Sequence, residues 1–215
     1  MKIAVAITSK TLEEALKDIQ TAKNSGADIA ELRIDYMDKP DLKKLIPGAG
    51  LPVIITNRCK EEGGYFDGCE EHRIAYLMAA ANLYADYLDI ELRHMPGEFD
   101  KKASKIIISY HNFSETPSNL KDIYREISYK GPDIIKIATM ANNKSDVNRM
   151  IDLIESADKP IIGICMGELG KKTRIHPKNY LTFACLPGKA SAPGQFEIDD
   201  MIKIIQSGQQ SYSFQ

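Results

Sequence analysis

The chain lacks any long apolar run, and this excludes a membrane-spanning helix. A span needs about 20 consecutive apolar residues, and no run within the 215 residues approaches that length. A basic stretch followed by a cleavage site, the mark of a secretory signal, is also missing, because strand-like residues begin directly at Lys2–Ile7. We therefore expect a soluble, cytoplasmic protein with no membrane partner.

Paired cysteines and an excess of basic charge are missing too. The 4 cysteines form no CxxC pair and have no histidine at ligand-like spacing, so we expect reduced structural thiols and no metal site. Lys and Arg (28) nearly balance Asp and Glu (30), which leaves a net charge of -2 and no basic field for nucleic acid. These absences favour a small-molecule partner.

What the chain does contain is a regular alternation of short β-branched runs with helical stretches or loops. The predicted strands are Ile3–Thr8, Ile29–Asp35, Val53–Arg58, Tyr87–Arg93, Ile106–His111, Ile134–Thr139, Ile161–Met166 and Leu181–Leu186. The predicted amphipathic helices are Leu12–Asn24, Glu70–Ala85, Asn119–Tyr129, Ser145–Ser156 and Ile198–Gln206. Eight strands with short connections favour a parallel sheet closed into a single (β/α)8 TIM barrel over residues 1–206.

An open doubly wound sheet is the structural alternative. For that fold we would expect a GxGxxG-type turn after the first strand, and Thr8–Thr11 does not resemble one. No linker, repeat or second domain is visible before residue 206. The tail over residues 207–215 is polar and poor in aliphatic side chains, so we expect it to be frayed or disordered.

Charged residues recur on one face of several predicted strands. Because residues i, i+2 and i+4 share a face, Leu32 and Ile34 should face the helices while Glu31, Arg33 and Asp35 face the barrel axis. The same alternation turns further polar residues inward: Thr56, Arg58, Asp89, Glu91, Arg93, Ser109, His111 and Lys136. One interpretation is a self-neutralising ion-pair network; we favour an active site, because the charges gather toward the C-terminal strand ends where this fold holds its active sites.

Lys136 is the most informative of these residues, since it lies between isoleucines in the middle of a strand. It is either a buried partner of Glu31 or Glu91, or a nucleophile whose desolvation leaves a neutral amine that attacks a ketone. The inward-facing arginines would favour the neutral amine further.

His111 ends the preceding predicted strand. A lone histidine there is readily explained as structural, but beside a lysine on the adjacent strand it becomes a proton carrier near neutral pH. We assign the remaining histidines, His72, His94 and His176, to the surface.

Taken together, these segments resemble type I 3-dehydroquinate dehydratase, the Schiff-base lyase of the shikimate pathway. The matching segments are Glu31–Asp35, Thr56–Arg58 with Glu62–Gly64, Ile108–His111, Lys136–Ala138, Met166–Gly167 leading to Arg174, and Ala190–Gln195. They occur in the family's order and cover nearly the whole chain.

The resemblance implies a homodimeric lyase that dehydrates 3-dehydroquinate to 3-dehydroshikimate through a lysine imine, the third step of that pathway, without a metal or cofactor. It assigns imine formation to Lys136, general acid–base catalysis to His111 and support of the histidine to Glu62. It assigns substrate binding to Glu31, Arg33, Arg58, Met166, Arg174, Ser191 and Gln195.

Two other functions stay open from the residues alone. A type I aldolase or transaldolase also uses a barrel lysine, but sugar-phosphate aldolases usually have a phosphate cradle after strands seven and eight. Here those loops offer Arg174, in a mobile-looking loop or a solvated basic turn, and Ser191–Gln195, which is either a lid or simply the eighth turn. The third alternative is a non-catalytic small-molecule-binding barrel.

Overall fold

The computed structural model describes residues 1–212, with side chains described to residue 208. The strands are β1 (Lys2–Ile7), β2 (Ile29–Arg33), β3 (Val53–Thr56), β4 (Tyr87–Glu91), β5 (Lys105–Asn112), β6 (Ile134–Met140), β7 (Ile161–Met166), β8 (Leu181–Cys185) and β9 (Phe196–Glu197). The α-helices are α1 (Leu12–Asn24), α2 (Leu42–Gly48), α3 (Glu70–Asn82), α4 (Leu120–Tyr129), α5 (Lys144–Ser156), α6 (Lys171–Arg174) and α7 (Ile198–Tyr212). Short 3-10 turns follow four strands: η1 (Ile34–Tyr36), η2 (Lys60–Glu62), η3 (Leu92–His94) and η4 (Glu168–Gly170).

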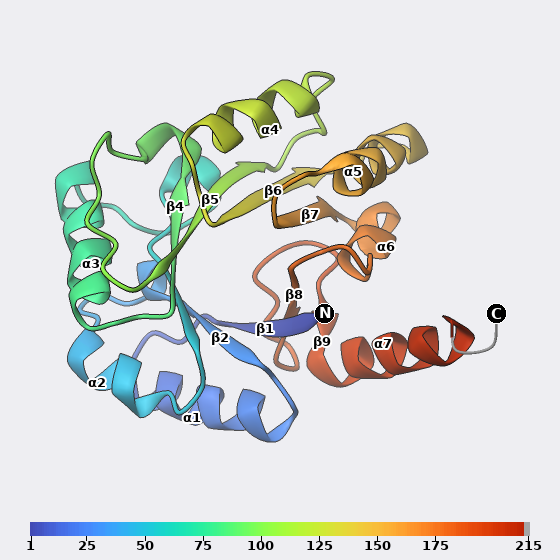
Figure 1. Ribbon diagram of the computed structural model, residues 1–215. Coiled ribbons are helices and arrows are strands. Elements are labelled where there is room, and N and C mark those ends of the chain that lie inside the picture. The colour runs from blue at the N-terminus through green and yellow to red at the C-terminus, as the bar shows by residue number, and fades with distance from the viewer. Residues whose placement is uncertain (213–215) are drawn as a thin grey trace.

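The strands form one parallel sheet in the order β7-β6-β5-β4-β3-β2-β1-β8-β9. The sheet curls around a central axis and the helices lie outside it (Figure 1). This confirms the predicted TIM-barrel architecture. In the part of the chain that the structure describes, no ladder joins β7 to β8. Instead, the Tyr180 N–H donates to the Ile161 carbonyl at 2.8 Å, and the Asn179 side chain bonds both backbone groups of Gly163.

Local capping contacts start two of the helices, α1 at the predicted residue and α5 one residue before the predicted start. The Thr11 hydroxyl accepts the Glu14 N–H at 3.2 Å and caps α1. Asn143 and Asp146 form a reciprocal capping box at the start of α5. Such caps satisfy backbone N–H groups that have no partner within the helix.

Apolar side chains fill two layers. The larger cluster lies between the sheet and the helices, and includes Ile19, Leu32, Leu77 and Ile108. The smaller cluster lies on the opposite face of the strands: Ala4, Ile29, Ile54, Tyr87, Ile107, Ile134, Ala138, Ile162, Ile164, Leu181 and Phe183. Its members near the starts of β2 to β6 are followed two residues later by polar side chains, so in these five strands polar groups lie above an apolar base on the inner face.

The 3-10 turns change two of the predicted inward residues. β2 ends at Arg33 and β4 at Glu91, so Asp35 and Arg93 lie in η1 and η3 instead of in strands. Asp35 remains buried, but Arg93 is exposed, and the prediction that Arg93 faces the barrel axis was wrong. The turn breaks the two-residue alternation on which that prediction rested.

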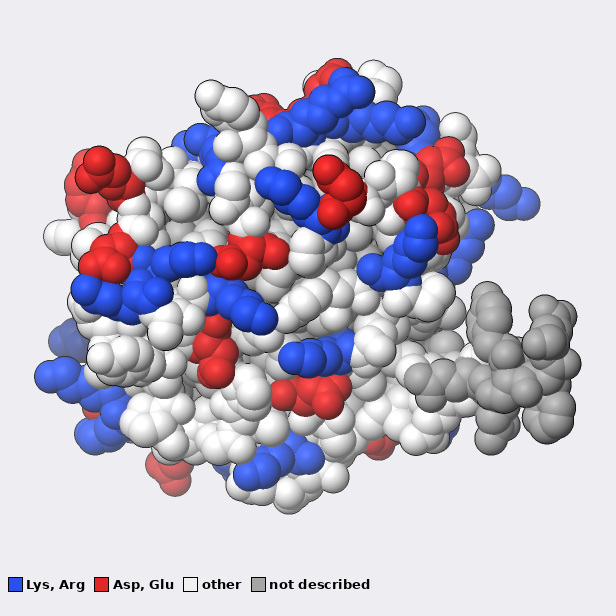
Figure 2. Space-filling view, in the orientation of Figure 1, with Lys and Arg blue, Asp and Glu red and all other residues white. Residues whose placement is uncertain are grey.

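The C-terminal helix is longer than predicted. α7 continues through Tyr212, into the segment that we expected to be a disordered tail, and residues 213–215 lie outside the described residues. No helix in the described range is long and apolar enough to cross a membrane. On the face shown in Figure 2, acidic and basic side chains are interspersed over the described residues.

Candidate active site

A pocket opens where the C-terminal ends of the strands meet, and all of the site residues predicted from the sequence line it. The remaining lining residues are Gly63, Phe113, Ala138, Ile164, Phe183 and Ala192. The parallel sheet explains this gathering, because it brings the C-terminal end of every strand to the same edge.

Lys136 projects from β6 into the pocket and is 6% exposed. Its Nζ atom lies 2.8 Å from Asp89 Oδ2 and 3.5 Å from Glu31 Oε1. Nζ also lies 4.3 Å from the centre of the Phe183 ring. Glu31 was one of the two ion-pair partners that we considered, whereas the closer partner, Asp89, was not.

A buried ion network lies beneath the lysine. Asp89 accepts from the Ser109 hydroxyl at 2.6 Å and lies 2.7 Å from Arg58 Nη2. Arg58 in turn lies 3.0 Å from Glu91. Burial alone would raise the pKa of Asp89, but Arg58 and Lys136 outweigh burial and hold it well below its usual range.

Arg73 completes this network and was missed by the sequence reasoning. It lies on α3 but is fully buried, donates to the Asn57 carbonyl at 2.8 Å and pairs with Glu91. A helix residue that reaches into a barrel is not visible in strand alternation. The one hint in the sequence was Glu91 itself, a carboxylate on an inward face that needs a buried cation to balance its charge.

The His111 side chain contacts Glu62, the last residue of η2. Glu62 Oε2 accepts the His111 backbone N–H at 2.9 Å and lies 2.9 Å from the ring Nδ1. This contact leaves Nε2 as the ring nitrogen for a bound molecule. Burial raises the pKa of Glu62 to about 7, while burial together with Arg58 and Lys136 holds the pKa of His111 well below 6.5.

Arg174 is the pocket cation without a carboxylate partner among the described residues. It is 2% exposed, and its Nη2 donates to the Pro193 carbonyl at 3.0 Å. The buried Nε has no hydrogen-bond partner in the described part of the chain. Burial lowers the pKa of Arg174 to about 10. A buried guanidinium with a free N–H is a binding group for an anion.

The segment that carries Arg174 is compact. η4 and α6 replace the mobile-looking loop that we predicted, and Arg174 is not on a solvated turn. The Thr173 hydroxyl accepts the Cys165 N–H at 2.8 Å, which anchors α6 to β7.

The loop after β8 is held against the loop after β7. Gln195 Oε1 accepts the Ser191 N–H at 2.8 Å, and Gln195 Nε2 donates to the Ala184 carbonyl at 3.0 Å. The Gly167 N–H donates to the Pro193 carbonyl at 3.2 Å. Gly194 has a φ of +70°, and a Cβ there would lie 2.5 Å from the Gly167 oxygen, so this close approach requires glycine.

The other predicted binding residues line the pocket with most of their groups already paired. Arg33 binds Asp35 through two hydrogen bonds of 2.8 and 2.7 Å. Glu31 accepts from the Thr56 hydroxyl at 3.0 Å. Met166, at the end of β7, is 1% exposed and contributes an apolar wall. Free charge in the pocket is therefore concentrated at Arg174.

Comparison with known proteins points in one direction. A family model described as Type I 3-dehydroquinase matches residues 3–212. The 3-dehydroquinate dehydratase of Methanothermobacter thermautotrophicus is 40% identical over 215 residues, which cover 95% of this chain and 96% of that protein. The enzyme of the same name from Methanocaldococcus jannaschii is 40% identical over 94% of this chain and 96% of that protein.

Solved structures agree with these sequence matches. The type I 3-dehydroquinate dehydratase of Clostridium difficile superposes with a TM-score of 0.86 at 26% identity, covering 98% of this chain and 92% of that one. The 3-dehydroquinate dehydratase of Aquifex aeolicus gives a TM-score of 0.78 at 31% identity, with 98% and 100% coverage. The matches span nearly the whole fold, the pocket included.

Proposed function

Since the chain belongs to the type I 3-dehydroquinase family, we propose that it dehydrates 3-dehydroquinate to 3-dehydroshikimate through an imine on Lys136, as the third step of the shikimate pathway. The observation that carries this proposal is the content of one pocket: a lysine amine, a histidine held by a carboxylate, and an arginine without a carboxylate partner among the described residues. The Clostridium difficile relative is described with covalently modified comenic acid, which agrees with covalent chemistry in this family.

The reaction divides into steps that these groups can perform. The Lys136 amine adds to the ketone carbon, and loss of water gives a protonated imine. The imine acidifies the neighbouring C–H, and His111 Nε2 removes that proton to give an enamine. The enamine expels the β-hydroxyl group, which leaves as water with the proton from the imidazolium. A second water hydrolyses the imine and restores the amine.

Glu62 positions the histidine for these transfers. Its carboxylate holds Nδ1, so that Nε2 faces the substrate and carries the mobile proton. Imine formation requires a neutral amine, whereas Lys136 is paired with Asp89. We propose that the Lys136 ammonium passes one proton to His111 Nε2 as Nζ leaves Asp89 for the ketone. The imidazolium then returns that proton to the carbinolamine hydroxyl, which departs as water.

The substrate carboxylate is assigned to Arg174, whose planar fork suits two oxygens at once. The hydroxyls and ring are assigned to the rest of the lining: Glu31, Arg33, Arg58, Met166, Ser191 and Gln195. We further propose that Ser191–Gln195 closes over the substrate to exclude water, that the enzyme works in the cytoplasm as a homodimer, and that it has neither nucleic-acid nor membrane partners.

The two alternative functions fit the pocket less well. A sugar-phosphate aldolase needs several donors for a phosphate, whereas the described pocket residues offer one cation without a carboxylate partner, Arg174. A binding protein has no need of a histidine–carboxylate pair beside a lysine.

The decisive experiment combines turnover with trapping. Purified protein with 3-dehydroquinate should release product, and added borohydride should reduce the imine to a stable adduct on Lys136, seen as a gain in intact mass. Lys136→Ala should lose the adduct and several orders of magnitude in rate. Lys171→Ala, at a half-buried lysine of α6 that pairs with Glu168, should keep both. Ligand binding with unchanged mass and no turnover would establish the binding-protein alternative.

A further inference from the structure

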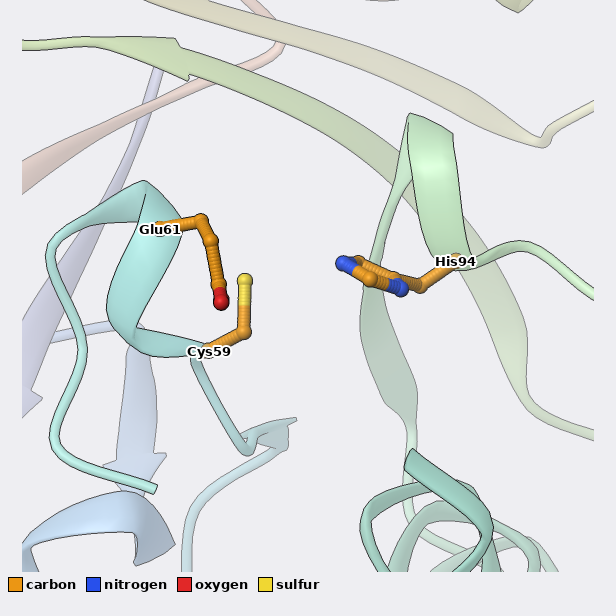
Figure 3. A group of neighbouring side chains, drawn as sticks. All are labelled: Cys59, Glu61 and His94. Carbon is orange, nitrogen blue, oxygen red and sulfur yellow. The ribbon is translucent and has the colours of Figure 1, made fainter. Parts of the chain in front are cut away.

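Outside the active site, three side chains of different chemistry face one small gap (Figure 3). The Cys59 sulfur, a Glu61 carboxylate oxygen and a His94 ring nitrogen all lie within 4.8 Å of one another. Cys59 directly precedes η2, Glu61 lies within it, and His94 ends η3, so the parallel sheet brings together residues that follow β3 and β4. The sequence spacing gave no sign of this group, because the residues are 35 positions apart at their ends.

We propose that Cys59, Glu61 and His94 bind a divalent transition-metal ion of the Zn²⁺ type. Sulfur, imidazole nitrogen and carboxylate oxygen are the ligands that zinc takes in proteins. Zinc–ligand distances of about 2.0–2.3 Å place the ligand atoms of a tetrahedral site roughly 3.3–3.8 Å apart. Glu61 is exposed and His94 half-buried, so both side chains have room to make the adjustment of about 1 Å that this geometry requires.

A carboxylate stands ready to orient the histidine. His94 Nδ1 lies 3.5 Å from Glu70 Oε2, and Arg73 holds Glu70 through hydrogen bonds of 2.8 and 2.7 Å. Metal-bound histidines usually donate their second ring N–H to such a carboxylate. Nε2 of His94 is then the nitrogen left for the ion.

The local charge suits a cation. The charge of the nearby Arg73 reaches Cys59 and Glu61, but Glu70 and Glu91 both pair with Arg73 and offset it. Glu61 itself has no Lys or Arg within 4.0 Å among the described residues. A cysteine binds a metal ion as the thiolate, so the bound ion takes the place of the thiol proton.

The proposed metal site is connected to the active site through η2. The same 3-10 turn carries Glu62, whose carboxylate holds His111. An ion that joins Cys59 and Glu61 to η3 would fix this turn and hence the position of Glu62.

Metal binding can be measured without turnover, so this test does not depend on the proposed dehydration. The chelator-treated full chain is titrated with Co²⁺ as a spectroscopic probe and then with Zn²⁺. We expect one equivalent of Co²⁺ to give a sulfur-to-cobalt charge-transfer absorption that Zn²⁺ abolishes. Cys59→Ser should remove that absorption. Removing a residue that only hydrogen-bonds to a metal ligand costs about 10–100-fold in metal affinity. His94→Gln removes a ligand itself, so it should weaken Zn²⁺ binding by more than about 100-fold.

The chain offers matched controls on the same side of the barrel. Cys69 and His72 are exposed, at and just after the start of α3, and belong to no such group among the described residues. Cys69→Ser and His72→Gln should bind both ions as the parent does. An absent charge-transfer absorption in the parent, or one that survives Cys59→Ser, overturns the proposal. If the buried Cys59→Ser variant does not fold, the Zn²⁺ affinities of Glu61→Gln and His94→Gln test the proposal instead. Unchanged Zn²⁺ affinity in both variants would overturn the metal site.

Discussion

The Glu62 carboxyl and the His111 imidazole act as one unit because Oε2 lies 2.9 Å from Nδ1. With the pKa of Glu62 raised by burial to about 7, the carboxylate form dominates only above that pH. In the proposed mechanism, the carboxylate accepts Nδ1–H and leaves Nε2 free to remove a proton from the substrate. Below pH 7 the protonated carboxyl would donate to Nδ1, and Nε2 would then carry the ring proton and could not act as the base.

The first prediction concerns this pair. The kcat/KM of the parent should rise as pH passes through 7, and Glu62→Gln should abolish that rise and lower the rate by roughly 10²-fold, within the range of general acid–base catalysis. Steady-state kinetics between pH 5 and about 9 measure both. Glu126→Gln, at an exposed position of α4, should retain the parental profile. An unaltered profile in Glu62→Gln would remove the carboxyl from the proton transfer.

Arg174 supports a second prediction, since its free N–H groups have no other anion to bind among the described residues. Loss of a hydrogen bond to a charged group costs about 1.5–3 kcal/mol, so Arg174→Ala should raise KM by roughly 10–150-fold, with a smaller change in kcat. Arg174→Lys keeps the positive charge but loses the planar fork, so its KM should lie between those of the parent and Arg174→Ala. Arg125→Ala, at an exposed arginine of α4, is the control. A KM that stays at the parental value would mean that the carboxylate binds elsewhere.

At this scale, strand alternation predicted the inward faces of Glu31 and Lys136, because both residues lie within strands and the side-chain period of two holds there. Arg58 lines the pocket as predicted, although it lies two residues beyond the end of β3. Strand alternation could not predict Arg73, which enters from a helix. Asp89 was correctly expected to face inward, but its contact with Lys136 depends on the register between strands. That register is set by pairing across β4, β5 and β6, which a single strand does not encode.

The loops after β7 and β8 behave as one element because their backbones touch. Gly194 approaches Gly167 so closely that a Cβ would lie 2.5 Å from the carbonyl oxygen. Ser191 and Gln195 flank this contact and line the pocket. The shape of the substrate site therefore depends on a backbone approach as well as on side chains.

The third prediction compares two glycines of this loop. Gly194 and Gly188 both have a φ of +70°, but a Cβ on Gly188 would meet nothing within 4 Å. Alanine costs about 1–2 kcal/mol at either position for the left-handed backbone. Gly194→Ala must also separate the two loops, so we expect it to raise KM at least tenfold while Gly188→Ala lowers only thermal stability. Equal kinetic effects in the two variants would show that the contact with Gly167 has no bearing on the site.

The sequence predicted the long elements well, because β-branched runs and amphipathic periods are local signals. It erred where short 3-10 turns end β2 and β4, which moved Arg93 to the surface. It also missed α6, whose four residues are too few to show a helical period. The packing of Thr173 against β7 stabilises this turn, and such tertiary support has no local signature.

For the whole molecule, the buried ion network couples folding to pH. The folded pKa of Asp89 lies below its unfolded value of about 3.9. Its contribution to stability is therefore complete above about pH 4 and is lost as pH falls below that value. Arg58 and Lys136 would then remain buried with one shared partner fewer.

The fourth prediction follows from this linkage. Asp89→Asn leaves two buried cations short of a carboxylate and should lower the free energy of unfolding at pH 7 by about 3–5 kcal/mol. The variant should also lose less stability than the parent when pH is lowered below about 4. Urea unfolding at a series of pH values measures both effects. Asp152→Asn, at an exposed position of α5, should follow the parent. A neutral-pH stability equal to the parent's would rule out this role for the network.

The guanidinium of Arg174 should also make the substrate-free enzyme sensitive to the anions in its buffer. Phosphate, citrate and sulfate carry the negative charge that Arg174 lacks as a partner among the described residues. We expect assay salts of this kind to compete with the substrate carboxylate, so that apparent affinities depend on the choice of buffer. The KM of this enzyme should therefore be measured in a zwitterionic sulfonate buffer with chloride as the only added anion.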